Sequence, residues 1–399
     1  MEKFKLINGI VLTPNRKLEN AIVLICDGKI EYVGPAPENT EDYQEIDCCG
    51  NYISPGFIDM HVHGGGGFDF MDGDAAAILG AAKAHAMHGT TSIVPTGLAG
   101  ELEDTQCFFN AFREAKGKKG GANLLGIHLE GPYYAQNFHG AIELEYLRNP
   151  APEHYKKILS MTDDLKIWSE APELPGSMEF GRYMTRHGIT PSIGHSGATF
   201  EQVLEARENG FHHITHLYSC TSTVSRKNCF RVAGIVEAAF YCDDVTVEII
   251  ADGVHLPEAL LKLIYKLKGA DKIALVSDSM RAAGMQDGES VLGSKKHGRK
   301  VIIKDKIAWL PDGSGFAGGT GTSDRLVRNM IQLGAVPITD AVRMMSETPA
   351  RIMGECTKGK IAVDYDADIV VFNQNIDVKM TMVRGNILMN ILPENQPKL

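Results

Sequence analysis

LLGIHLEGP, residues 124–132, is the segment from which the architecture of this 399-residue chain is inferred. It consists of a short apolar run that ends in a carboxylate, Glu130, and is followed at once by glycine and proline. Burying a carboxylate costs free energy unless the charge meets a cation or a metal ion. Barrel enzymes build their sites at the carboxyl ends of parallel strands, so this segment predicts a barrel strand that carries a site residue.

One sequence pattern extends on both sides of this segment, between about residues 55 and 354. Short apolar strands alternate with helices there, which is typical of repeated βα units around a parallel sheet. A capping box at 199–202 predicts a helix that Gly210 closes, and Pro257 predicts the start of a helix that runs to Gly269. Residues 295–315 are expected to form a β-hairpin. The expected strands are 57–62, 91–95, 124–129, 190–193, 213–217, 246–250 and 272–277.

The two ends of the chain differ from this middle part because both are rich in strand and turn patterns. Residues 5–11, 21–26 and 29–33 are expected strands, the last two joined by an Asp-Gly turn, and 367–372 and 379–383 continue the pattern. The predicted fold class is therefore α/β: a (β/α)₈ TIM barrel with a small β-sandwich domain formed by both chain ends. The predicted domains are residues 1–54 and 356–399 for the β-sandwich and residues 55–355 for the catalytic barrel.

Composition narrows the classes of function. No apolar run approaches the roughly 20 residues that span a bilayer, and no signal peptide is evident, which predicts a cytoplasmic protein. The eight cysteines lack paired spacing and are expected to be reduced thiols. A net charge of −10 argues against nucleic acid and membrane as partners, so an anionic substrate requires a local basic pocket. Residues 225–231 carry three cations and are a candidate phosphate site, with a solvated loop as the alternative.

Histidines follow several of the expected strands. His195 and His216 end neighbouring strands, and together with Glu130 they would bind a metal ion and leave a position open for water, as catalytic sites require. Each of these residues taken alone has an ordinary explanation, as a core or surface histidine or as a salt-bridged glutamate. His61 and His63 alternate on one strand face and are further candidate ligands, although an isolated pair of this kind often has one buried and one solvent-facing member.

Two further polar residues follow strands. Asp278 comes after strand 272–277, where a carboxylate can accept the proton of an activated water and return it to a leaving amine. The alternative for Asp278 is a helix N-cap. His255 comes after strand 246–250 and is placed to contact substrate, with an exposed loop histidine as the alternative.

Several motifs in order carry a resemblance that runs nearly end to end: PGFIDMHVHG at 55–64, HLEGP at 128–132, GHS at 194–196, THLY at 215–218, ADGVH at 251–255, VSD at 276–278 and FAG at 316–318. With these motifs the chain resembles the N-acetylglucosamine-6-phosphate deacetylases of the amidohydrolase superfamily. The resemblance implies a metal-dependent enzyme of amino-sugar catabolism, usually a homodimer, that removes acetate from the 2-acetamido group of a sugar phosphate.

The resemblance also implies roles for individual residues. Glu130, His195 and His216 would bind the principal metal ion, and His61 and His63 would supply a second one. Asp278 would be the acid/base residue. His255 would contact the sugar, and the phosphate would meet an arginine from the partner subunit, Arg231 or otherwise Arg226. The other implied substrate contacts are Ser219, Cys220, Ala141, Ile142, Phe316, Ala317 and Gly318.

The chain departs from the family pattern near the substrate. Ser219 and Cys220 stand where the family commonly has Asn-Ala, and Ile142 stands at a family histidine, which leaves the preferred hexosamine epimer open. A sibling amidohydrolase acting on N-acetylgalactosamine-6-phosphate or a cyclic amide is one alternative, and a catalytically silent barrel used for binding or assembly is another. The cofactor is expected to be a divalent metal, foremost zinc or iron, as one ion or two, since imidazole and carboxylate suit several metals.

Overall fold

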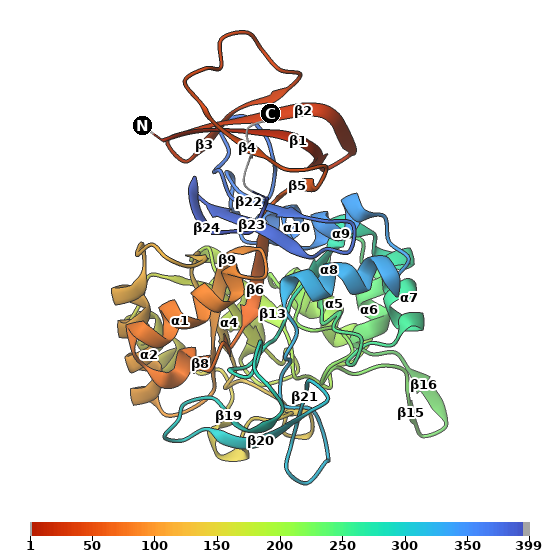
Figure 1. Ribbon diagram of the computed structural model, residues 1–399. Helices are drawn as coiled ribbons and strands as arrows, with labels where there is room; N and C mark the ends of the chain where they lie inside the picture. Colours follow the sequence, from red (N-terminus) through yellow and green to blue (C-terminus); the bar gives the residue numbers. More distant parts are fainter. Residues whose placement is uncertain (1, 394–399) are drawn as a thin grey trace.

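The computed structural model describes residues 2–393 and has a parallel β-barrel at its centre (Figure 1). Near the carboxyl ends of the first and last strands, the Asp278 amide donates to the His61 carbonyl at 2.9 Å and thereby links these strands. The predicted barrel is confirmed. Its eight strands, in sheet order, are β6 (Phe57–Val62), β9 (Thr90–Leu98), β11 (Ile127–Glu130), β12 (Leu165–Glu170), β13 (Thr190–Ile193), β14 (His213–Ile214), β17 (Thr246–Ile249) and β18 (Ile273–Leu275).

The structure differs from the expected barrel strands at several places, and β18 covers only part of the expected 272–277. Strand β12 was not predicted, because Lys166, Ser169 and Glu170 obscure the apolar pattern of LKIWSE. The expected strand 124–129 is divided into β10 (Asn123–Leu124) and β11. Strand β14 is shorter than expected because the backbone turns at His216, which has a φ of 27°.

The helices surround the barrel, and the predicted start and end signals of α5 and α7 are confirmed. The Thr199 hydroxyl accepts a hydrogen bond from the Gln202 amide, and the Gln202 side chain accepts one from the Thr199 amide. This capping box opens α5. Helix α7 begins directly after Pro257 and ends before Gly269. Within residues 2–393, we find no helix that is both long and apolar enough to span a membrane. The α-helices are α1 (Ala75–Ala86), α2 (Leu102–Ala115), α3 (Pro152–Leu159), α4 (Ser177–Arg186), α5 (Phe200–Glu208), α6 (Ile235–Tyr241), α7 (Glu258–Lys268), α8 (Ser323–Gln332), α9 (Ile338–Met344) and α10 (Glu347–Ile352).

Both chain ends form a β domain at one end of the barrel, drawn at the top of Figure 1. The two ends meet where β5 pairs antiparallel with β22. The strands form one continuous sheet around a shared apolar core rather than two separately bonded sheets. The exact domain boundaries stay a prediction. The strands are β1 (Lys3–Thr13), β2 (Arg16–Cys26), β3 (Lys29–Gly34), β4 (Gln44–Asp47), β5 (Tyr52–Pro55), β22 (Ile369–Phe372), β23 (Val378–Val383) and β24 (Asn386–Asn390).

Smaller sheets extend from the barrel, separate from the sheet of the β domain. The excursion expected as a hairpin at 295–315 begins earlier and has three strands, β19 (Gly288–Leu292), β20 (Arg299–Lys304) and β21 (Ile307–Trp309). This three-stranded sheet lies at the end of the barrel opposite to the β domain (Figure 1). A two-stranded hairpin, β15 (Ser225–Lys227) and β16 (Phe230–Val232), projects from the side of the molecule (Figure 1).

Candidate active site

Three side chains that are far apart in the sequence meet at the carboxyl end of the barrel. Glu130 is the last residue of β11, His195 follows β13, and His216 follows β14. The Nε2 atoms of His195 and His216 each lie 3.0 Å from Oε1 of Glu130. All three side chains are buried, so the carboxylate and the imidazoles form one group that could hold a metal ion.

A second group of possible ligands shares Glu130 with the first. His61 and His63 point to the same side of β6, and both are buried, so neither is the solvent-facing histidine of the alternative interpretation. His63 Nε2 lies 3.2 Å from Oε2 of Glu130, and His61 Nε2 lies 3.7 Å from Oε1. Within each of the two groups the ligand atoms all lie within 4.8 Å of one another. Glu130 is therefore common to both groups and would be a ligand whether one of them or both held an ion.

The four imidazoles are oriented by hydrogen bonds on their outer nitrogens. Each Nδ1 faces an oxygen of a backbone carbonyl or a carboxylate, which can only accept, so Nδ1 carries a hydrogen and Nε2 is directed at Glu130. Such outer partners are typical of metal-binding histidines. They are Phe138 O at 2.8 Å for His195, Ser219 O at 3.1 Å for His216, Glu248 Oε2 at 2.9 Å for His61 and Thr96 O at 3.3 Å for His63.

The buried carboxylates and imidazoles of the two ligand groups favour a bound cation. Burial lowers the pKa of His63, but hydrogen bonds to Asp278 and Glu130 outweigh burial and raise that pKa to about 9. Buried Nε2 of His61 has no hydrogen-bond partner. Because metal ligands bind in their deprotonated form, a divalent ion can displace protons here and satisfy the carboxylates. The residues present therefore fit a divalent metal ion, and imidazole with carboxylate suits zinc, iron, manganese or cobalt.

Asp278 lies beside the second group of ligands. Its Oδ1 is 3.1 Å from His63 Nε2 and 3.6 Å from His61 Nε2. Burial raises the pKa of Asp278, but His61 and His63 outweigh burial and hold that pKa below its ordinary value, so the carboxylate is ionised. The alternative as a helix N-cap is wrong, because the next helix along the chain, α8, begins only at Ser323.

The backbone is strained at three of these residues. His195, His216 and Asp278 have φ values of 50°, 27° and 45°, in the left-handed region that residues with a side chain rarely adopt. Such conformations cost about 1–3 kcal/mol each and persist where the surrounding structure enforces them, typically at functional sites. At these three residues the left-handed conformation changes the direction of the backbone near the carboxyl end of a barrel strand.

Glu248 is a supporting residue that the sequence did not reveal. It lies in β17, fully buried, with Oε2 at 2.9 Å from His61 Nδ1 and at 3.2 Å from the amide of His216. Its Oε1 lies 3.2 Å from Nε2 of His213. A carboxylate inside an otherwise apolar strand, 246–250, was the available signal. Glu248 thus positions ligands of both groups.

His128 supports the cluster in a different way. Its ring contacts the His61 ring edge-on at 4.6 Å, and its Nε2 lies 2.7 Å from Oγ of Ser169. Burial and the neighbouring His61 lower its pKa well below the ordinary value, so this imidazole is neutral. His128 therefore packs against the ring of His61 as a neutral imidazole.

Replacing Glu248 tests its positioning role. We expect Glu248→Gln to weaken metal binding by about 10- to 100-fold, because outer partners of metal ligands have effects of this size. Metal affinity is measured by competition with a chelator. Glu170→Gln is the matched control, since Glu170 is an equally buried carboxyl group that binds Ser177 and no histidine. Equal metal affinity in both variants would contradict the role of Glu248.

The ligand cluster forms part of the lining of a cavity of about 590 Å³, within the range of small-molecule sites. His255 lines this cavity, with Nδ1 at 2.9 Å from Oδ2 of Asp252. Burial lowers the pKa of His255, but the bond to Asp252 outweighs burial and raises it. The other predicted contacts that line the cavity are Ala141, Ile142, Ser219, Cys220, Phe316 and Gly318.

Three predicted substrate contacts lie elsewhere. Ala317 is buried in the apolar core of the three-stranded sheet and is absent from the lining of the cavity. Arg226 and Arg231 face each other across the β15–β16 hairpin and are exposed. Neither arginine lines the cavity within this chain. The candidate phosphate site at 225–231 is therefore an exposed hairpin that does not line the cavity of its own chain.

An eight-stranded parallel barrel with this histidine and carboxylate cluster at the carboxyl ends of its strands defines a barrel hydrolase. The chain belongs to the amidohydrolase family, whose sequence profile matches residues 52–388. The resemblance inferred from the motifs is thereby confirmed.

Individual relatives agree with this assignment. N-acetylglucosamine-6-phosphate deacetylase of Lysinibacillus sphaericus is 33% identical over 95% of this chain and 96% of its own length. N-acetylgalactosamine-6-phosphate deacetylase of Escherichia coli O157:H7 is 30% identical over 94% of this chain and 97% of its own. The crystal structure of N-acetylglucosamine-6-phosphate deacetylase from Pasteurella multocida superposes with a TM-score of 0.90, at 28% identity, over 97% of this chain and 100% of that chain.

Proposed function

We propose that this protein is a metal-dependent hydrolase that converts N-acetylglucosamine-6-phosphate to glucosamine-6-phosphate and acetate in amino-sugar catabolism. The observation that carries the proposal is the convergence of His195 and His216 on one carboxylate oxygen of Glu130, inside a cavity that also exposes Asp278. The names of relatives that match nearly the whole chain support the substrate.

The residues divide the chemistry among them. Glu130, His195 and His216 would hold a divalent ion, which would supply Lewis acidity to lower the pKa of water and polarise a carbonyl oxygen. The ionised carboxylate of Asp278 accepts the proton of the attacking water and passes it to the departing sugar nitrogen. Burial lowers the pKa of His255, but the bond to Asp252 outweighs burial and raises it, which favours the protonated imidazole whose Nε2 can donate to a substrate oxygen.

Three finer points belong to the same proposal. The ion is zinc or iron, and the two ligand groups that share Glu130 leave room for one ion or two. The enzyme acts in the cytoplasm as a homodimer in which Arg231, or otherwise Arg226, reaches the phosphate in the partner's cavity. The exposed hairpin supports this arrangement, because Phe230 at its tip is 76% exposed, as expected for a segment that a partner covers.

The competing functions have less support. A sibling enzyme for N-acetylgalactosamine-6-phosphate remains the second candidate, since one relative carries that name and Ser219, Cys220 and Ile142 line the cavity. A catalytically silent barrel does not explain why ligands, acid/base carboxylate and oriented histidines are all in place.

Acetate release tests the proposed function and its metal dependence. We expect the metal-loaded protein to release acetate from N-acetylglucosamine-6-phosphate faster than from N-acetylgalactosamine-6-phosphate or unphosphorylated N-acetylglucosamine, and faster than it opens the ring of a cyclic amide, which yields no acetate and is followed by the ring-opened product. A chelator should abolish this activity, and a divalent ion should restore it, because the water needs a Lewis acid. Faster turnover of the galactosamine epimer would favour the sibling enzyme. Failure to hydrolyse any of the four substrates with metal bound would refute the proposal.

A further inference from the structure

The cavity beside the metal ligands contains one permanent cation of its own chain. Among the described residues that line it, Arg299 is the only lysine or arginine. The chain as a whole carries a net charge of −10, and Glu130 and Asp278 add carboxylates to the cavity itself. An anionic substrate entering this cavity therefore gains from a compensating positive group, and Arg299 is the permanent one that the single chain provides.

Arg299 is held by a rigid element. It is the first residue of β20 and pairs with Leu292 of β19, which also lines the cavity. The apolar core of the three-stranded sheet packs against Leu98, the last residue of β9, and against Ala141 of a barrel loop. The chain segments that lead into and out of this sheet are joined by a bridge between Ser279, the residue after Asp278, and Gly319. The sheet that carries Arg299 is therefore attached to the barrel beside the acid/base carboxylate.

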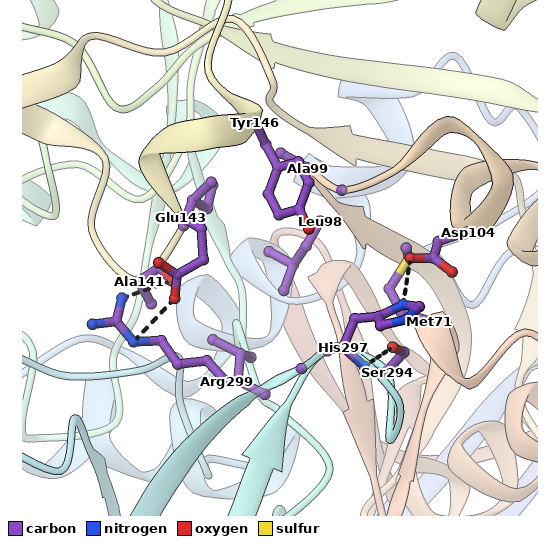
Figure 2. Close-up of a pocket in the computed structure, with 15 residues that line it drawn as sticks. Met71, Leu98, Ala99, Asp104, Ala141, Glu143, Tyr146, Ser294, His297 and Arg299 are labelled. Carbon is purple, nitrogen blue, oxygen red and sulfur yellow. Dashed lines mark hydrogen bonds and ion pairs between the residues drawn. The ribbon is translucent and has the colours of Figure 1, made fainter.

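The present contacts of the Arg299 guanidinium are weak. Nη1 donates to the carbonyl of Ala141 at 3.2 Å, and Nε lies 3.7 Å from Oε1 of Glu143 (Figure 2). The Glu143 side chain is 56% exposed, so this ion pair contributes little. Other nearby basic groups have different partners, since Figure 2 shows His297 turned to Asp104, 3.1 Å away. Arg299 can exchange Glu143 for a stronger anion at small cost.

A small side pocket of about 70 Å³ adjoins the main cavity at this arginine. The two share Arg299, Leu98, Ala141, Ile142 and Leu292 in their lining. A volume of this size holds a few water molecules but not a second sugar. The side pocket therefore gives the guanidinium room to turn between Glu143 and the main cavity.

We propose that Arg299 of the same subunit binds the phosphate of the substrate and releases Glu143 when it does so. This inference rests on the proposed function and names a specificity-determining residue for it. A guanidinium matches phosphate with two parallel hydrogen bonds, which a distant exposed carboxylate does not offer. Arg299 acts independently of the hairpin arginines, because it requires no partner subunit.

The test compares phosphorylated and unphosphorylated ligands in the metal-loaded enzyme. Arg299→Gln should lower the ratio of kcat/KM for N-acetylglucosamine-6-phosphate to that for N-acetylglucosamine by about 10- to 100-fold, the size of a lost charge-assisted hydrogen bond. The loss should lie in KM rather than kcat. Arg299→Lys keeps the charge without the two parallel bonds and should fall between the wild type and Arg299→Gln. An unchanged ratio would overturn the proposal.

Glu143→Gln distinguishes phosphate binding from a purely structural link. If Arg299 only braced residues 139–143 through Glu143, both variants would impair both substrates alike, and that result would also overturn the proposal. We expect instead that Glu143→Gln leaves the ratio at or above the wild-type value, because it removes the competing anion. Arg231→Gln and Arg226→Gln, measured in parallel, test the partner-subunit prediction separately.

A binding measurement keeps this test separate from the proposed reaction. The dissociation constants of glucosamine-6-phosphate and glucosamine are measured by calorimetry for wild type and Arg299→Gln. If the wild type shows no deacetylase activity, the proposed function fails. Arg299 is still supported if its replacement weakens glucosamine-6-phosphate alone by about 10- to 100-fold. Equal binding of the sugar phosphate by both proteins, or no binding to either, counts against Arg299.

Discussion

Asp278→Asn is expected to lower kcat by about 10²- to 10⁴-fold, the usual contribution of a positioned acid/base group. The asparagine amide has nearly the shape of the carboxylate but cannot accept the proton of water. Metal content should stay at the wild-type level, because Asp278 belongs to neither of the two groups of possible ligands. Acetate release and metal analysis on the same preparation measure both effects.

The position of Asp278 makes this result informative. Its Oδ1 lies 3.1 Å from Nε2 of His63, close enough that a structural role is a real competitor. A structural role predicts loss of metal or of folding together with activity. Wild-type turnover in Asp278→Asn would show that another group moves the proton.

Glu130→Gln is expected to have the largest effect, because Glu130 is the one side chain common to both groups of possible ligands. Removing its charge leaves the imidazoles without the anion that draws a cation between them. We expect the variant to lose bound metal and at least ~10³-fold in kcat/KM, since a metal ion supplies several kcal/mol of transition-state stabilisation. Metal analysis and acetate release measure the two losses.

His63→Gln is the matched control for Glu130→Gln. His63 belongs only to the group formed with His61, so its replacement should leave the group of Glu130, His195 and His216 able to hold an ion. The activity that remains reports whether the second position matters. If Glu130→Gln keeps as much metal as the wild type, the ion lies elsewhere.

Much of the fold could be predicted because its signals are local. The capping box at Thr199 and the ends of α7 at Pro257 and Gly269 follow from short-range hydrogen bonding and backbone geometry. The missed strand, β12, shows the limit: Lys166 and Glu170 read as polar, although Ile167 and Trp168 are buried. Its pairing with β11 and β13 stabilises it as a barrel strand, which is a tertiary effect.

The candidate site, like the fold, could be predicted from the sequence only in part. Glu130 and His195 could be proposed from the sequence because, together with His216, they follow successive predicted strands, a combination that ordinary core histidines or a salt-bridged glutamate do not explain. Glu248 and Arg299 were not predicted, since a single charge within a strand usually means a solvated edge; only Glu248, among apolar neighbours, carried a signal of burial. Residues 225–231 were the candidate basic pocket, and they form an exposed hairpin, so within this chain Arg299 is the arginine that lines the cavity. The role of Arg231 in a partner's cavity stays a prediction.

The sequence by itself determined which chemical groups stand at the ends of the barrel strands and, through the order of its motifs, the family. Only the tertiary structure decided how these side chains are oriented and which of them lie together. The carbonyls of Phe138 and Ser219 that orient His195 and His216 belong to the backbone, which every residue possesses, so no side chain marks them in advance. Closing the barrel brings β6 against β18 and sets His63 beside Asp278, a proximity that arises from long-range strand order rather than from any local pattern.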